Sequence, residues 1–176
     1  LRKMAKKNPR INEIINKRGE LLPDQETFSY VSGYLEEKFL NSQNLLLEGY
    51  PRSVKQYELL KNWLKKRGSK IDRAFFLDIS ERESIRRLAA RRVCEKCATL
   101  YNLITNPPPT TNTCKCGGKL IQRVDDTTEA IKERLLLYKK TTLPLIRVLE
   151  KEGILERVNG QRQIGVIFQD IIKRLQ

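Results

Sequence analysis

The spacing of apolar residues along this chain predicts helices that alternate with short buried strands. After Pro23, apolar residues recur every three or four positions, which is the period of an amphipathic helix. This helix would bury Phe28, Val31, Leu35 and Phe39. A second segment with the same period ends near residue 66 and would point four apolar side chains inward: Val54, Leu60, Trp63 and Leu64.

Three short apolar runs predict strands, at residues 45–47, 74–79 and 153–158. The first run leads into a tight loop, and a closing helix is expected over residues 166–175. Because strands alternate with helices, the expected fold is α/β with a parallel sheet. Ligands of such sheets bind beyond the carboxyl ends of the strands.

Polar residues mark the starts of two further helices. Ser80 and Glu83 form a capping box, in which the serine accepts a hydrogen bond from a first-turn amide and the glutamate reaches back. The helix that follows would carry Arg87 and Arg91 one turn apart, and therefore on one face. Residues 126–129 would open the other helix.

The composition is that of an ordinary globular protein with a strong positive charge. The chain has 176 residues, 39% of them hydrophobic and 32% charged, with a net charge of +14. This length suits about one domain, and the charge favours polyanionic partners, although most of the 35 Lys and Arg are expected to be solvated surface residues. No apolar run approaches the length of about 18 residues that a membrane span needs, and no signal-peptide pattern is found at the start. We therefore expect a cytoplasmic protein without a membrane partner, and the lack of histidine excludes a His base or ligand.

Four cysteines are spaced like the ligands of a zinc ribbon. Sixteen residues separate the pair Cys94 and Cys97 from the pair Cys114 and Cys116. The segment between them holds few large apolar residues, and ordering a backbone costs roughly 1–2 kcal/mol per residue. A structural Zn²⁺ contributes on the order of 10–16 kcal/mol to such a site, which favours zinc. The second pair has one intervening residue where two are usual, and buried reduced thiols or disulfides are the alternatives.

Two groups of residues have the chemistry to bind phosphate. In the loop of residues 48–52, Gly49 lets a ligand approach the backbone, Pro51 fixes the turn and Arg52 projects a planar fork. A second group flanks the cysteines and consists of Arg87, Arg91, Arg123 and Arg134. Taken alone, the loop could be a plain strand-to-helix turn, and the arginines could be solvated helix faces.

Together these motifs resemble the adenylate kinase family, and the resemblance covers essentially the whole chain. Glu48-Gly-Tyr-Pro-Arg52 is similar to the Asp-Gly-Phe-Pro-Arg signature of that family. The cysteine segment, followed by Gln122-Arg-Val-Asp-Asp126, is similar to its zinc-bearing LID. Glu133-Arg134-Leu, with Tyr138 and Thr142-Leu-Pro144, resembles the helix that leaves the LID.

The resemblance implies a fold, a domain organisation and a reaction. The fold would be a P-loop NTPase-like three-layer αβα arrangement with a parallel sheet, plus a small zinc-ribbon-like LID. Residues 1–89 and 127–176 would form the core with its AMP-binding region, of which residues 1–22 are a part, and residues 90–126 would form the LID. The reaction would be reversible phosphoryl transfer from MgATP to AMP, giving two ADP. The protein would act as a monomer with Mg²⁺ and a structural Zn²⁺ as cofactors.

The resemblance also implies roles for residues at matching positions. AMP would be bound by Arg2, Glu20, Leu21, Leu22, Gly49, Tyr50, Pro51, Arg52, Gln56, Arg123 and Arg134, with Gln56 at the adenine edge. ATP would contact Arg87, Arg91, Leu100, Tyr101 and Arg162. The arginines that stabilise charge during transfer would be Arg52, Arg87, Arg91, Arg123 and Arg134. Asp125 and Asp126 would close the LID, and zinc would be bound by Cys94, Cys97, Cys114 and Cys116.

One motif of the family is absent from the 176 residues. The phosphate loop requires Gly-x-x-x-x-Gly-Lys-Ser/Thr. The Gly118-Lys119 pair lies among the cysteines, with Thr113 where the first glycine would stand. By the resemblance, the first strands and the phosphate loop would precede Leu1, and we expect the chain to be inactive alone. Glu48 replaces the aspartate of the family, and we expect this to retune the rate rather than abolish activity.

Other functions also fit the residues. A UMP or CMP kinase would share the scaffold, although the zinc-type LID favours AMP. A basic zinc-ribbon module could bind nucleic acid through the charge of +14. The cysteine segment lacks aromatic residues for base stacking, and the α/β remainder would have no role in such a module, so we expect no nucleic-acid partner. A non-catalytic AMP-binding protein is a third alternative.

Overall fold

The computed structural model describes residues 7–18, 20–39 and 44–176. The chain divides into two compact units. We call Leu1–Ala74 with Leu136–Glu156 the helical unit, and Phe75–Leu135 with Arg157–Gln176 the cysteine unit.

The helical unit begins with a short helix that is capped by a side chain. Asn8 accepts hydrogen bonds from the amides of Arg10 and Ile11 and starts α2 (Pro9–Asn12), with proline in the first turn. A π-helical turn, η1 (Glu13–Lys17), follows directly.

Two predicted amphipathic helices of this unit are confirmed. Helix α3 covers Asp24–Phe39 and α4 covers Val54–Lys65. Leu35 of α3 and Leu60 of α4 are buried. Further predicted inward residues are half-buried: Phe28, Val31, Val54, Trp63 and Leu64.

An apolar core joins α4 to the later part of α6, the long helix Thr128–Lys151. Tyr57 of α4 packs with Leu145 and Leu149 of α6. The Tyr57 hydroxyl also donates to Glu152 Oε2 over 2.6 Å. This core is built from side chains that are distant in the sequence.

The strand predicted at residues 45–47 is not formed, and that prediction was wrong. Residues 44–47 have no regular secondary structure, and the Leu46 residue is 87% exposed. None of the strands in the described residues pairs with this segment. A strand needs a neighbour to satisfy its amides and carbonyls, and an apolar run supplies no such partner.

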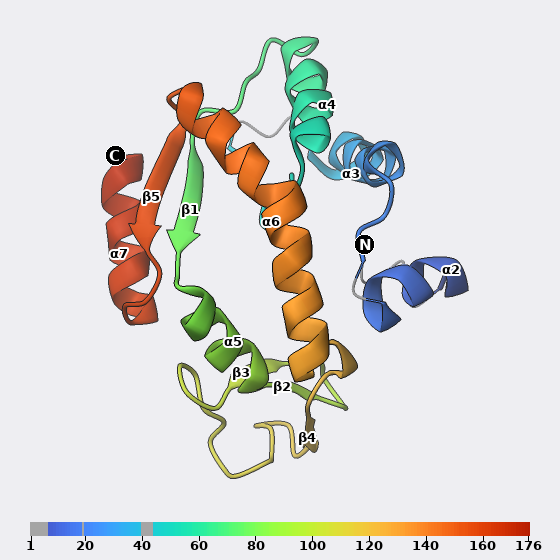
Figure 1. Cartoon of the computed structure of the whole chain (residues 1–176), viewed down its shortest axis with the longest axis vertical. Coiled ribbons are helices and arrows are strands. Elements are labelled where there is room, and N and C mark those ends of the chain that lie inside the picture. Colours follow the sequence, from blue (N-terminus) through green and yellow to red (C-terminus); the bar gives the residue numbers. More distant parts are fainter. Residues whose placement is uncertain (1–6, 19, 40–43) are drawn as a thin grey trace. The chain divides into compact units, whose positions relative to one another are not determined.

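The other two predicted strands pair with each other. Strands β1 (Ala74–Asp78) and β5 (Leu155–Asn159) lie side by side and run in the same direction (Figure 1). After β5, Gly160 donates its amide hydrogen to the Asp78 carbonyl over 2.9 Å. A Cβ on Gly160 would lie 2.7 Å from Ile79 Cγ2, so only glycine fits this close approach. Helix α7 (Ile164–Leu175) closes the chain beside β5 (Figure 1).

Helix α5 (Glu81–Ala89) ends earlier than the sequence suggested. Arg91 is the first residue of strand β2 (Arg91–Cys94), so the prediction that it shares a helix face with Arg87 was wrong. The physical reason is strand pairing, because Arg91 lies opposite Asn102 in an antiparallel ladder and cannot continue the helix.

A small antiparallel sheet lies at the centre of the cysteine segment. Its strand order is β3–β2–β4, with β3 at Leu100–Asn102 and β4 at Leu120–Ile121. A 3-10 turn, η2 (Val124–Asp126), then leads to the start of α6, where Thr127 accepts a hydrogen bond from the Ala130 amide. We call residues 91–121 the cysteine lobe. Among the described residues, no helix combines the length and apolarity needed to cross a membrane.

Candidate functional site

The four cysteine sulfurs of the cysteine lobe form one cluster. All four Sγ atoms lie within 4.8 Å of one another. Cys97 Sγ is 3.5 Å from Cys114 Sγ and 3.3 Å from Cys116 Sγ, and Cys94 Sγ is 3.5 Å from Cys116 Sγ. None of the four forms a disulfide. Tetrahedral zinc with Zn–S bonds of about 2.3 Å separates its sulfurs by about 3.8 Å, so the cluster could hold a structural zinc.

The short Cys114-x-Cys116 spacing does not keep the second pair from the cluster. The Cys114 amide donates to the Gly118 carbonyl, and the Gly117 amide donates back to the Cys114 carbonyl, each over 2.9 Å. A Cβ on Gly118 would lie 2.6 Å from Cys94 Sγ, so this position has no room for a side chain. The predicted metal site gave Gly118 no role, although the Gly-Gly that follows Cys116 is a signal for a close turn.

Few apolar side chains support the cluster. The buried core of the lobe consists of Cys94, Tyr101, Cys114 and Leu120. The large apolar residues around it are exposed, namely Leu100, Leu103 and Ile104. The expectation that this segment has too small a core to fold on apolar burial alone is consistent with these contacts.

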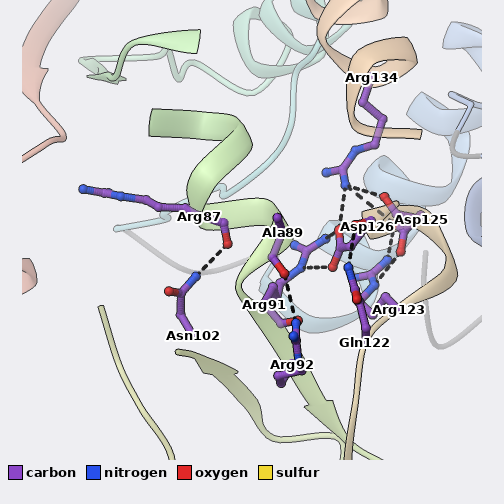
Figure 2. A network of polar contacts seen from close by, with 10 residues as sticks. All are labelled: Arg87, Ala89, Arg91, Arg92, Asn102, Gln122, Arg123, Asp125, Asp126 and Arg134. Atoms are coloured by element: carbon purple, nitrogen blue, oxygen red, sulfur yellow. Dashed lines mark hydrogen bonds and ion pairs between the residues drawn. The ribbon is translucent and has the colours of Figure 1, made fainter. Parts of the chain in front are cut away.

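Where the lobe meets η2 and α6, arginines converge on two buried aspartates (Figure 2). The Arg91 guanidinium donates to both Asp126 oxygens, with Nε 2.7 Å from Oδ2. Arg123 binds Asp125 in the same two-bond way, with Nε 2.7 Å from Oδ1. The Gln122 amide donates to the Asp126 carbonyl over 2.8 Å. Each carboxylate is thus held by a planar fork, the strong bidentate form of ion pair.

Arg134 of α6 bridges the two pairs. Its Nη1 lies 3.3 Å from Asp126 Oδ1, 3.3 Å from the Asp125 carbonyl and 3.8 Å from Asp125 Oδ2. Burial lowers the pKa of Arg134, and the positive charge of Arg91 lowers it further. The side chain of Asp126 is fully buried, whereas those of Arg91 and Arg134 keep 20% and 29% exposure. Three arginines and two aspartates therefore share one partly buried site with an excess of positive charge.

Arg87 does not join this group. Its side chain points away from the other arginines, and its carbonyl accepts a hydrogen bond from Asn102 (Figure 2). The Arg87 guanidinium instead donates to Glu83 over 2.6 Å and to the Gly160 carbonyl over 2.8 Å. Hydrogen bonds from Arg86 and Arg87 lower the pKa of Glu83 to about 2. The serine half of the predicted capping box is confirmed, but the glutamate binds these arginines.

In the helical unit, the loop of residues 49–52 is held by hydrogen bonds from Arg52 itself and from α6. Gly49 has a φ of +72°, a conformation that favours glycine. Arg52 Nε donates to the Gly49 carbonyl over 2.7 Å. Thr142 of α6 donates to the Arg52 carbonyl over 2.9 Å. The backbone of this arginine is thereby fixed while its side chain remains exposed.

Gln56 is bonded at both ends of its side chain. Its Oε1 accepts from the Arg52 amide over 2.8 Å, and its Nε2 donates to Asp24 Oδ1 over 2.9 Å. Asp24 also accepts from the Ser53 hydroxyl over 2.9 Å, and Gln56 is 2% exposed. These bonds of Asp24 were not predicted from the sequence, because Ser53 and Gln56 lie 29 and 32 positions later and the contacts are tertiary.

The remaining predicted site residues lie in varied surroundings. Arg2 lies outside the described residues. Glu20 is exposed, Leu21 is half-buried, and Leu22 is buried against Ile11. Tyr50 and Pro51 are half-buried.

Among the residues predicted to contact ATP, the Arg162 side chain donates hydrogen bonds to the Asn159 carbonyl and to Asp170. Leu100 is exposed and Tyr101 is buried.

Comparison with known proteins agrees with these features. The sequence model of the adenylate kinase family matches residues 1–154. Adenylate kinase from Caldanaerobacter subterraneus subsp. tengcongensis is 39% identical over 159 residues, which cover 90% of this chain and 72% of that protein. Adenylate kinase from Thermotoga maritima is 38% identical over 165 residues, covering 93% and 74%. Adenylate kinase from Oceanobacillus iheyensis is 40% identical over 154 residues, covering 87% and 71%.

The observed fold and the cysteine cluster agree with membership of this family. A mixed helix and strand structure with a parallel strand pair is consistent with the P-loop NTPase-like αβα fold of that family. The family uses Mg²⁺ with ATP, and the cysteine cluster fits an additional structural zinc. The chain therefore belongs to the adenylate kinase family, whose general reaction is phosphoryl transfer between ATP and AMP to give two ADP.

Proposed function

We propose that this chain supplies the acceptor loop and the LID of an adenylate kinase, with MgATP as donor and AMP as acceptor. The observation that carries the proposal is the convergence of Arg91, Arg123 and Arg134 on two buried carboxylates. Guanidinium forks bind carboxylate and phosphate with the same bidentate geometry, so a site that gathers them is suited to phosphoryl oxygens. The names of the relatives favour AMP over UMP or CMP as the acceptor.

In this proposal residues 90–126 are the LID, and its aspartates compete with phosphate for the arginines. The three guanidinium groups and two carboxylates leave a net positive charge, which favours a polyanion. When a phosphate binds Arg91 or Arg123, Asp125 and Asp126 are released to form the hydrogen bonds that close the LID. Arg87 approaches the phosphates separately, braced by Glu83.

Arg52 and Gln56 are the proposed acceptor residues. One N–H of Arg52 is bound to the Gly49 carbonyl, which leaves the four N–H groups of its fork for the AMP phosphate. Beyond its present bonds, the Gln56 side-chain amide has one free N–H and one free oxygen lone pair. The oxygen can accept from the amino group of adenine, and the N–H can donate to a ring nitrogen of adenine. Because Gln56 is buried, contact with the base requires that this side chain be uncovered.

Catalysis would rest on positioning and charge stabilisation. Phosphoryl transfer needs no covalent intermediate with the protein, and Mg²⁺ carried by ATP supplies further charge neutralisation. The 176 residues contain no Gly-x-x-x-x-Gly-Lys-Ser/Thr sequence. We therefore expect the chain by itself to bind AMP without forming ADP above background. That it acts as a monomer in the cytoplasm stays a prediction.

Calorimetric titration with AMP tests the acceptor site. The 176-residue chain should bind AMP saturably, and Arg52→Ala should weaken binding by about tenfold or more, because a charge-assisted hydrogen bond contributes about 1.5–3 kcal/mol. Arg67→Ala is the matched control, since Arg67 belongs to the same unit but lies outside residues 1–22 and pairs with Glu36 at the surface. Equal AMP binding by wild type and Arg52→Ala would contradict the assignment. Salt-sensitive binding of a duplex oligonucleotide, without AMP binding, would instead support the zinc-ribbon alternative.

A further inference from the structure

The hydroxyl group of Tyr101 faces a sulfur of the cysteine cluster. Tyr101 lies on β3 and is 6% exposed, packed with Cys94, Cys114 and Leu120. Its hydroxyl oxygen is 3.4 Å from Cys114 Sγ. The same oxygen accepts a hydrogen bond from the Lys115 amide over 3.3 Å. The phenol is thus held at two points beside one of the four metal-ligating positions.

The direction of the oxygen–sulfur hydrogen bond follows from the chemistry of a metal-bound cysteine. A cysteine that binds zinc is a thiolate, which has no proton to donate. The hydroxyl must then be the donor, with its proton directed at the sulfur. Its lone pair receives the Lys115 amide hydrogen, which orients the group.

We propose that Tyr101 is a positioning residue of the metal centre, which acts through a hydrogen bond from its hydroxyl to the Cys114 thiolate. This inference rests on zinc binding by the four cysteines and is independent of the catalytic roles proposed above. It differs from the role near the ATP base that the family resemblance implied for Tyr101. Groups that hydrogen-bond to metal ligands fix their orientation, and losing one typically weakens metal binding by about 10–100-fold.

A second hydroxyl in the lobe provides an internal comparison. Thr99 Oγ1 lies 3.1 Å from Cys97 Sγ, but both residues are exposed. Water can replace an exposed hydroxyl as a hydrogen-bond donor, whereas water has little access to the buried Tyr101 hydroxyl. Removing the Thr99 hydroxyl should therefore weaken metal binding much less than removing the Tyr101 hydroxyl.

Tyr101→Phe is the decisive variant, because it keeps the ring in the core and removes only the hydroxyl. Tyr57→Phe is the matched control, since Tyr57 is equally buried but donates to Glu152 rather than to a sulfur. Zinc affinity would be measured on the full chain by competition with a chromophoric chelator. Cobalt substitution would report the sulfur-to-metal charge-transfer bands.

We expect Tyr101→Phe to weaken zinc binding by at least tenfold and to shift the charge-transfer bands of the cobalt form. Tyr57→Phe should stay within twofold of wild type, and Thr99→Val should lie between the two. Affinity of Tyr101→Phe within twofold of wild type, with unchanged bands, would overturn the proposal. So would a Tyr101→Phe chain that stays unfolded at saturating zinc, because metal binding should restore a fold that is lost only through weaker affinity. A wild-type chain that binds less than half an equivalent of zinc would overturn both the metal centre and the role of Tyr101.

Discussion

In the helical unit, Tyr57, Leu145 and Leu149 pack together with six further apolar residues partly buried around them. In the cysteine lobe, two of the four buried core residues are themselves cysteines. Burial of apolar surface contributes about 25 cal/mol per Å², and a lobe with so few apolar side chains gains little of it. Metal ligation by the sulfurs, together with the ion pair of Arg91, must therefore supply in the lobe the stability that apolar packing supplies in the helical unit. We therefore expect the stability of the lobe to depend on a bound metal, whereas the helical core depends on apolar packing.

Metal removal should have the largest effect and should separate the two regions. A structural zinc contributes on the order of 10–16 kcal/mol to a small site, so chelation should unfold the lobe. Measured by hydrogen exchange, the Cys94 and Cys114 amides, which are bonded to Thr99 and Gly118, should lose protection. The Tyr57 amide of α4, which is bonded to Ser53, should keep its protection and serves as the internal control. Equal loss in both regions, or none in the lobe, would show that the comparison is wrong.

Removing a buried charge should give the next largest effect. Asp126→Ala removes the carboxylate that pairs with Arg91 and the nearer of the two carboxylates that pair with Arg134, and breaking a buried pair costs about 3–5 kcal/mol. We expect about 3 kcal/mol, because both arginines retain some exposure to water. Urea unfolding would measure the change. Asp78→Ala is the control, since its pair with Arg157 is exposed and should contribute less than about 1 kcal/mol. Similar losses for the two variants would mean that burial is not decisive here.

A cavity in the helical core should be nearly as destabilising. Leu145→Ala removes a buried side chain that packs with Tyr57 and Leu149, and such changes cost about 2–5 kcal/mol. Zinc affinity measured by chelator competition should be unchanged, which sharpens the contrast between the two regions. Leu136→Ala on the same helix is the control, because that leucine is exposed. A loss of zinc affinity in Leu145→Ala would show that the two regions are energetically coupled.

The smallest predicted effect is a pH dependence. Because Arg86 and Arg87 lower the pKa of Glu83 from 4.5 to about 2, the ionised carboxylate stabilises the folded chain above pH 4.5. That contribution should be lost as the pH falls from 4.5 to about 2. Glu83→Gln should flatten the curve of melting temperature against pH in this window. Arg86→Ala should reproduce part of the flattening, because Arg86 is the larger cause. An unchanged curve in both variants would refute this origin of the acid sensitivity.

Periodic patterns predicted the helices of this chain well, and they failed where pairing is tertiary. Helices α3, α4 and α7 lie where the apolar spacing placed them. The apolar run at residues 45–47 was read as a strand, but strand formation depends on a neighbour that no local pattern reveals. The end of α5 was placed too late for the same reason, since the pairing of Arg91 with Asn102 ends the helix.

The sequence identified the residues of the candidate site, but it predicted only in part which of them lie together. Four arginines were expected to act together, and three of them converge on the aspartates. The ion pair of Arg87 with Glu83 was predictable from their four-residue spacing on a helix. The contacts of Asp24 with Ser53 and Gln56 could not, because they join separate elements.

The sequence by itself determined the family motifs, the cysteine pairs and the amphipathic helices, because these depend on residue type and short-range spacing. Tertiary structure alone decided which carboxylate each arginine binds and where the Tyr101 hydroxyl is directed. It also decided that Gly118 must lack a side chain. The physical reason is range, because a hydrogen bond or a close contact forms only within a few ångströms, and the folded chain sets which distant residues come that near.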